Sequence, residues 1–213
     1  MLLSCVSGGG NLAGHFMMRY SLKKTSGPGS EPITLAEAKA HLRISGTDEN
    51  DLINGLIQAA REMAETYTKR QLITSTYTAK YRDFPDAEGS IHVPRTPLQS
   101  VTSITYIDNQ GAEQTLSTDV YEVLDDDTEA WIVLKPLQSW PEVQAEKKQA
   151  VTVTFVAGYG NSGSSVPAAA RSAILMLIGH LFENRESVAA GSFNKLPLAT
   201  EILLDSISVK EPA

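Results

Sequence analysis

The glycine-rich segment Gly158–Gly163 is the strongest candidate for phosphate chemistry in the sequence. Its outer glycines have the spacing found in a phosphate-binding loop, which also needs a lysine and a hydroxyl residue directly after the second glycine. Ser164 and Ser165 follow instead, without a lysine. A dinucleotide-binding fingerprint would need a parallel βαβ unit, which the surrounding sequence does not offer. We therefore interpret the segment as a turn between a strand and a helix, and we expect no cofactor.

The histidines and carboxylates do not form a metal-binding pattern. The histidines stand at positions 15, 41, 92 and 180, and none lies three or four residues from another, as two ligands on one helix would. We interpret His180 as a core or interface residue. The run Asp125–Asp127 with Glu129 lacks the central glycine and the distal glutamate of a calcium loop. This run is interpreted as a solvated turn between strands, and no metal ion is expected.

The remaining motifs favour neither hydrolysis nor DNA recognition. Gly160–Gly163 lacks the second glycine spacing of a GxSxG nucleophile motif. A helix-turn-helix protein needs cations on its recognition helix, whereas the helix expected after Gly46 begins with the acidic stretch 48–51. We therefore predict that the protein is not an enzyme and has no catalytic residues. A small nucleotide-binding or hydrolytic enzyme and a DNA-binding regulator are the two alternatives.

The charge balance also argues against nucleic-acid binding. The chain of 213 residues has 18 basic and 25 acidic residues, a net charge of -7. An acidic chain gains no sequence-independent affinity from phosphate neutralisation. The negative charge is concentrated in residues 71–165, whereas residues 1–30 contain three basic residues and no acidic one. No run of about 18 apolar residues indicates a membrane span. The single cysteine, Cys5, allows no disulfide within the chain.

Local signals predict three helices. Thr34 followed by Glu37 is a capping box that begins a helix ending near Leu42. Asp48 is expected to cap a second helix to about residue 69, and Pro167 opens a third that ends near residue 186. The spacing of the apolar residues in the second helix describes one buried face, and these residues are Leu52, Ile53, Leu56, Ile57, Ala60, Met63, Ala64 and Tyr67.

Between the second and third helices the residue pattern changes to that of strands. From Leu72 onwards β-branched and aromatic residues alternate with polar ones, and the stretch 108–111 is a hairpin signal. Short strands at this spacing are typical of a small antiparallel sandwich or barrel. The expected strands are 73–81, 91–93, 101–107, 113–116, 121–124, 131–134 and 151–156.

The order of these elements predicts an α+β fold, a small helical bundle with an inserted antiparallel β region that is sandwich- or barrel-like. Residues 1–30 have glycine-rich stretches and no sustained period, which indicates a flexible arm. Translation could start at Met1 or at Met17 or Met18. The expected segments are a flexible N-terminal arm (1–30), the N-terminal half of the helical core (31–70), the inserted β region (71–160), the C-terminal half of the helical core (161–190) and a C-terminal docking tail (191–213).

The tail is predicted to dock on a partner because it is unusually apolar for a solvated segment. It follows Gly191 and is broken at Pro197, so it cannot continue the third helix. In one arrangement the tail is disordered alone and becomes ordered on a partner. In the other it folds back on its own core. The candidate docking residues are Leu196, Leu198, Ile202, Leu203, Leu204 and Ile207.

Several stretches together resemble the head–tail connector family of tailed bacteriophages, also called head completion or adaptor proteins. The likeness covers about residues 31–207. It is carried by the order and spacing of the capped helix at 34–42, Pro97–Val101, Ile104–Tyr106, Gln138–Pro141, Gly158–Gly160 and the helix from Val166 to Glu186.

This resemblance implies a structural virion protein at the head–tail junction, assembled in the host cytoplasm. Family members form a homo-oligomeric ring, usually twelve-fold, between the portal protein and the tail-completion or tail-terminator proteins. The ring extends the channel, and DNA passes through it without specific binding. The docking tail would then bind the portal protein, and no membrane is involved.

Overall fold

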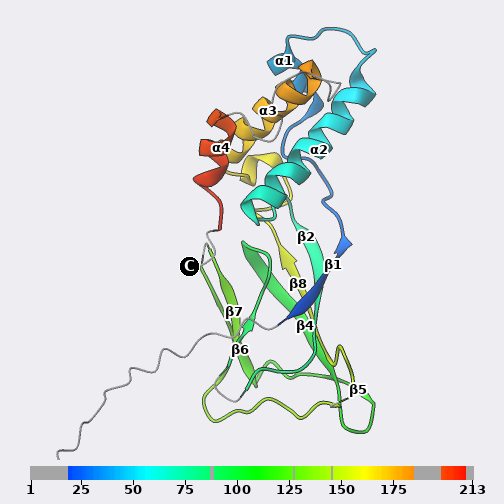
Figure 1. The fold of residues 1–213 in the computed structure, drawn as a ribbon, viewed down its shortest axis with the longest axis vertical. Helices are drawn as coiled ribbons and strands as arrows, with labels where there is room; N and C mark the ends of the chain where they lie inside the picture. Colours follow the sequence, from blue (N-terminus) through cyan, green and yellow to red (C-terminus); the bar gives the residue numbers. More distant parts are fainter. Residues whose placement is uncertain (1–18, 87–88, 127, 145, 185–197, 210–213) are drawn as a thin grey trace, which may run out of the picture.

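The structure, a computed structural model, describes residues 19–86, 89–126, 128–144, 146–184 and 198–209. These residues form a helical lobe and a β lobe that follow one another along the long axis of the molecule (Figure 1). The helical lobe consists of α1 (Leu35–Leu42), α2 (Asn50–Thr68), α3 (Ala168–Glu183) and α4 (Leu198–Asp205). The strands are β1 (Tyr20–Ser26), β2 (Ser75–Tyr81), β3 (Ile91–His92), β4 (Leu98–Ile107), β5 (Glu113–Thr115), β6 (Tyr121–Asp125), β7 (Ala130–Leu134) and β8 (Val151–Ala157).

The predicted α+β class is confirmed, because strands β2 to β8 lie between α2 and α3 in the chain. All strand pairs are antiparallel. The five-stranded sheet has the order β1-β2-β8-β4-β5, and the three-stranded sheet has the order β3-β7-β6. Buried side chains of both sheets, among them Phe155 and Ile132, form one core. The β lobe is therefore a two-sheet sandwich and is not closed into a barrel.

Strand β8 shows why the sandwich forms. Its residues alternate between buried and partly exposed along the whole strand, so one face lies in the core. The buried face includes Val151, Val153 and Phe155, and the ring of Phe155 stacks on Tyr77 of β2 with 5.6 Å between centroids. This β-branched and aromatic face holds the sheet against its partner sheet.

The capping box predicted for α1 is present. The Thr34 hydroxyl accepts a hydrogen bond from the Glu37 backbone N–H (3.2 Å), and the Glu37 carboxylate accepts one from the Thr34 N–H (2.8 Å). The predicted cap of α2 was wrong: the residue at the N-cap position is Glu49, and its side chain makes no capping hydrogen bond. A turn in which Asn50 N–H donates to the Thr47 carbonyl (3.1 Å) leaves Asp48 outside the helix.

The apolar part of the buried face of α2 is narrower than predicted. Ile53, Ile57, Ala60 and Ala64 are buried, as expected from their spacing. Leu56 and Tyr67 are only partly buried. Leu52 and Met63 lie at the borders of this stripe and are each 39% exposed, so their assignment to the core was wrong. Arg61, Glu65 and Thr68 are buried beside this stripe, so the covered face of α2 includes these polar residues in place of Leu52 and Met63.

The prediction that all of residues 1–30 form a flexible arm was also wrong for its second half. Tyr20–Ser26 forms β1, an edge strand that pairs with β2 from Tyr20↔Tyr81 to Ser26↔Thr76. Six of its seven residues are exposed and two are lysines, so no apolar alternation marks the strand. Polar, lysine-containing edge strands are a common protection against aggregation, which explains why the pattern was missed. Residues 1–18 lie outside the described residues.

Candidate docking surface

The C-terminal segment packs on the helical lobe. Thr200 and Leu204 of α4 are fully buried. Beyond α4, the Val209 N–H donates to the Thr68 carbonyl (3.0 Å), and the Arg70 side chain donates to the Ile207 carbonyl. For residues 198–209 the structure thus has the second of the two expected arrangements, in which the tail folds back on its own core.

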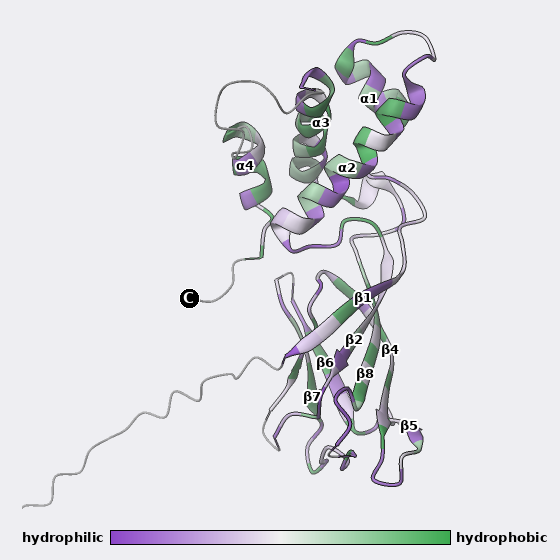
Figure 2. Ribbon diagram, turned by 45° about the vertical axis from the view of Figure 1, so that its right-hand side comes forward, coloured by the Kyte–Doolittle hydropathy of each residue, from purple (hydrophilic) through white to green (hydrophobic). Residues whose placement is uncertain are grey.

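This packing separates five of the six candidate docking residues by their exposure. Leu198 and Ile202, one helical turn apart, are 72% and 60% exposed. Leu203 and Ile207 are partly buried in the helical core, and Leu204 is fully buried there. Leu196 lies outside the described residues. Of the five candidates that the structure describes, only Leu198 and Ile202 offer large apolar area to a partner, and Figure 2 shows the apolar character of α4.

A groove of about 520 Å³ runs between α2, α3 and α4. Its floor contains Leu177 and Leu204, which are fully buried, and Met63 is exposed at its border. The remaining lining comes from α2. The complete lining is Ala59, Glu62, Met63, Thr66, Tyr67, Leu177 and Leu204. Sequence reasoning missed this groove because it assigned Met63 to the core and did not place α4 on α2.

Carboxylates surround the apolar floor. The Tyr67 hydroxyl donates to Asp205 Oδ1 (2.8 Å), and this bond, with the charge of Glu201 nearby, raises the pKa of Tyr67 to about 12. Glu62 lines the groove from α2, with its side chain 57% exposed. The groove therefore combines an apolar floor with an acidic border, a surface suited to an apolar segment that lacks acidic residues.

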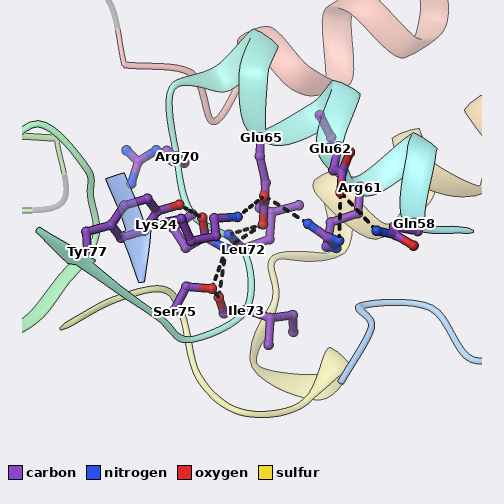
Figure 3. A network of polar contacts seen from close by, with 12 residues as sticks. Lys24, Gln58, Arg61, Glu62, Glu65, Arg70, Leu72, Ile73, Ser75 and Tyr77 are labelled. Carbon is purple, nitrogen blue, oxygen red and sulfur yellow. Dashed lines mark hydrogen bonds and ion pairs between the residues drawn. The ribbon is translucent and has the colours of Figure 1, made fainter. Parts of the chain in front are cut away.

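A buried ion-pair network connects α2 with the β lobe. The Arg61 side chain is 3% exposed and donates to Glu31 Oε2 (2.7 Å). It also donates to Glu65 Oε2 (3.1 Å), as Figure 3 shows. Burial opposes the charge of Arg61, but the hydrogen bond to Glu31 and the charges of Glu65, Glu31 and Glu62 outweigh it and raise the Arg61 pKa. Removing one partner of such a buried pair leaves an uncompensated charge and is strongly destabilising.

Glu65 extends the network into the sheet. Its carboxylate accepts hydrogen bonds from Gln71 Nε2 (2.6 Å), the Leu72 N–H (3.3 Å) and Lys24 Nζ (3.5 Å) of β1. The Tyr77 hydroxyl of β2 donates to Gln71, and burial together with the Glu65 charge raises the pKa of Tyr77 to about 12. This network fixes the end of α2, and with it the groove, relative to the β lobe.

The segment Gly158–Gly163 joins the two lobes. Gly158 N–H donates to the Pro97 carbonyl (2.9 Å), and Thr74 N–H donates to the Gly160 carbonyl (2.9 Å). Gly158 has φ +134°, and a Cβ there would lie 2.7 Å from Thr74 N. The glycine is needed for this close backbone approach. A 3₁₀ turn (Gly163–Ser165) and α3 follow, so the predicted strand-to-helix turn is confirmed.

The acidic run and the histidines have structural contacts. Asp126 Oδ1 accepts hydrogen bonds from the Thr128 hydroxyl and from the N–H groups of Thr128 and Glu129, which lowers the Asp126 pKa. Asp127 lies outside the described residues. The His92 ring contacts Trp131 at 4.7 Å between centroids. Among the residues that the structure describes, no group of three potential metal ligands gathers, and no helix is long and apolar enough to cross a membrane.

Three solved structures from gene transfer agent particles have this fold. The neck of an empty gene transfer agent particle, computed with C6 symmetry, has a TM-score of 0.76 at 20% identity. The neck of the native particle, computed with C12 symmetry, has a TM-score of 0.74 at 19% identity. Both likenesses cover 91% of this chain and 97% of the other. The virion of the native gene transfer agent matches with a TM-score of 0.73 at 20% identity, covering 90% of this chain and 97% of the other.

The sequence comparisons lead to the same type of protein. No curated protein matches the chain. A family model does match residues 32–130, which include α1, α2 and strands β2 to β6. The match confirms the family resemblance: residues 32–130 carry the sequence pattern of the Phage gp6-like head-tail connector proteins.

Proposed function

We propose that the protein is a structural subunit of the neck of a tailed-phage particle, where it forms a homo-oligomeric ring between the portal protein and the tail-completion proteins. The observation that carries this proposal is the connector-family match over residues 32–130. The neck structures computed with C6 and C12 symmetry support a ring, because they have the same fold over nearly the whole chain. The protein would act in the virion by assembly and not by catalysis.

A ring subunit must hold its docking surfaces in a fixed orientation. The network of Arg61, Glu65 and Gln71 provides this by connecting α2 to the first two strands of the five-stranded sheet. The negative charge of residues 71–165 fits a channel component past which DNA slides without being held. In this proposal the isolated protein is monomeric and closes into a ring only on the portal.

Portal docking is assigned to the exposed apolar residues of α4. Leu198 and Ile202 are the two candidate residues that remain largely exposed after the tail has folded back. Apolar side chains of this size contribute most to binding when a partner buries them completely. The buried Leu204 supports them from below by holding α4 on the core.

The test mixes the purified protein with its cognate portal protein and follows binding and ring formation by light scattering and electron microscopy. We expect a monomer alone at micromolar concentration and rings on the portal. The double variant Leu198→Asp/Ile202→Asp should bind the portal at least about ten-fold more weakly, the loss expected from about 1.4 kcal/mol. Leu137→Asp is the matched control, because Leu137 is 104% exposed and belongs to the β lobe.

Three results would contradict the proposal. A closed ring that forms without portal would refute ordered assembly. Equal portal binding by the α4 double variant and the Leu137 control would remove docking from α4. A steep salt dependence of DNA binding would favour a DNA-binding regulator.

A further inference from the structure

The outer face of the three-stranded sheet carries an apolar patch with an acidic border. Leu124 of β6 is 53% exposed and lies opposite Trp131 of β7, and Val133 is partly exposed two residues further along β7. Glu122 is exposed and lies opposite Val133. Glu129 accepts a hydrogen bond from Trp131 Nε1 (3.2 Å) at the other end of the patch. We call these five residues the acidic face.

The outer face of the five-stranded sheet has the opposite character. Strands β1, β2, β8 and β4 contain no aspartate or glutamate. Alternate residues of β2 and β8 are buried in the core, so the residues between them point outward. Strand pairing places these outward side chains in two rows across the sheet, Lys23-Thr78-Thr154-Ser103 and Ser21-Lys80-Thr152-Thr105. We call these eight residues the lysine face.

The two faces belong to different sheets and lie on opposite sides of the β lobe (Figure 2). A closed ring of identical subunits is built from head-to-tail contacts, and each contact joins two different surfaces of the chain. We propose that in the ring the acidic face of one subunit packs on the lysine face of the next. This inference rests on the proposed connector function and names the surface through which neighbouring copies contact one another.

The side chains of the two faces are complementary. The carboxylate of Glu122 pairs with the ammonium groups of the lysine face, whose four strands contain no carboxylate that competes for them. The methyl groups of the threonine rows cover Leu124. Trp131 is of the residue type most often found at the centre of an interface, and its ring attracts a lysine ammonium. Each subunit therefore contributes a different half of the contact on each of its two sides.

The contact is small, which fits a ring that closes only on the portal. The acidic face spans three strands of at most five residues, an area of about 14 Å by 17 Å. A stable interface buries about 800 Å² on each partner, roughly three times this area. Two free subunits therefore associate weakly, and the contact forms when the portal holds subunits side by side.

Charge reversal tests the contact. Ring formation on the cognate portal is followed by electron microscopy and light scattering for Glu122→Lys and for Lys23→Glu/Lys80→Glu. Asp48→Lys is the matched control, because it makes the same charge change as Glu122→Lys at an exposed position of the helical lobe, outside α2. The melting temperature of each variant shows that its fold is kept.

We expect Glu122→Lys alone, and Lys23→Glu/Lys80→Glu alone, to need at least about ten-fold more protein than the wild type for half-maximal ring formation, because like charges meet at every contact. A 1:1 mixture of the two variants should return close to the wild-type value. Alternating subunits then have opposite charges on both sides of every contact.

The possible failures are distinguishable. A wild type that forms no ring on the portal would refute the connector function itself. Wild-type rings that both charge variants leave as intact as Asp48→Lys does would overturn this contact alone. Variants that are weakened but not rescued by mixing would assign these residues to the portal contact, and would also overturn the proposal.

Discussion

Replacing Leu204 by alanine tests whether α4 belongs to the folded core. Leu204 is fully buried among residues of α2 and α3, so the substitution removes three carbon atoms from a closed environment. At about 0.8 kcal/mol per buried CH₂ the lost transfer free energy is about 2.4 kcal/mol. The remaining cavity adds to this, and we expect a loss of about 3 kcal/mol, within the range of about 2–5 kcal/mol for such truncations.

Ile202→Ala is the matched control in the same helix. Ile202 is 60% exposed, so only about 1 kcal/mol of apolar burial is lost. The higher helix propensity of alanine returns about 0.4 kcal/mol, which leaves a net loss near 0.5 kcal/mol. The two variants of α4 are therefore expected to differ by about 2.5 kcal/mol.

Equilibrium unfolding in urea, followed by circular dichroism, measures both free energies of unfolding. The Leu204→Ala variant should also melt about 6–12 °C lower, because 1 kcal/mol corresponds to about 2–4 °C at this chain length. Ending the chain after Gly191 should lower the melting temperature by several degrees as well, because it exposes Leu177. If Leu204→Ala and Ile202→Ala are equally stable, α4 does not pack on the core in solution and the tail is free to order on a partner.

Three further predictions concern single residues. Gly158→Ala should lower the free energy of unfolding by at least about 2 kcal/mol, because φ is +134° and the new Cβ would meet the Thr74 backbone. Gly55 lies in the middle of α2 with open space around its Cα, so Gly55→Ala should raise the free energy of unfolding by up to about 1 kcal/mol in the same urea titration. Leu56→Ala should lower the free energy of unfolding by about 2 kcal/mol, the lower end of the range for core residues, because Leu56 is only partly buried. A loss below about 0.5 kcal/mol would place Leu56 on the surface. The capping-box hydrogen bonds lower the pKa of Glu37, so its carboxylate stabilises the fold above the unfolded-state pKa and loses this effect as pH falls through the lower folded-state value. Glu37→Gln should therefore melt below the wild type at pH 7, and this difference in melting temperature should shrink as the pH falls below the ordinary carboxyl pKa of 4.5; a difference that stays constant would contradict the prediction.

Three of the four described helices and most strands could be predicted because their signals are local, whereas α4 lies in the segment expected to be a tail. The capping box at Thr34 and the alternation in Val151–Ala157 each follow from a few consecutive residues. The helix borders were less accurate. Whether Asp48 or Glu49 is the N-cap of α2 depends on the hydrogen bond that closes the preceding turn, and the spacing of residue types does not predict that bond.

The docking surface was only partly predictable, because it depends on contacts between distant segments. The sequence identified Leu198 and Ile202 as apolar tail residues but did not distinguish them from Leu204, which faces the core. The network around Arg61 includes bonds between Arg61 and Glu31, 30 positions apart, and between Lys24 and Glu65, 41 positions apart, and no motif encodes them. The residue types gave a signal, since Arg61 and Glu65 are spaced as an i, i+4 pair, but exposed pairs of this kind are far more common.

The route of the chain between the lobes has a mechanical consequence. The chain enters the β lobe first, crosses to the helices after β1, returns after α2 and crosses again after β8. Three covalent connections therefore run side by side between the lobes, each anchored in a neighbouring strand of one sheet, in the order β1-β2-β8. A pulling force along the long axis would be divided among the three connections and would load in shear the hydrogen bonds between β8 and β4, the neighbouring strand that has no direct connection to the helices. Strands loaded in this way must break together and cannot peel apart one bond at a time, so the subunit should resist extension as a single body.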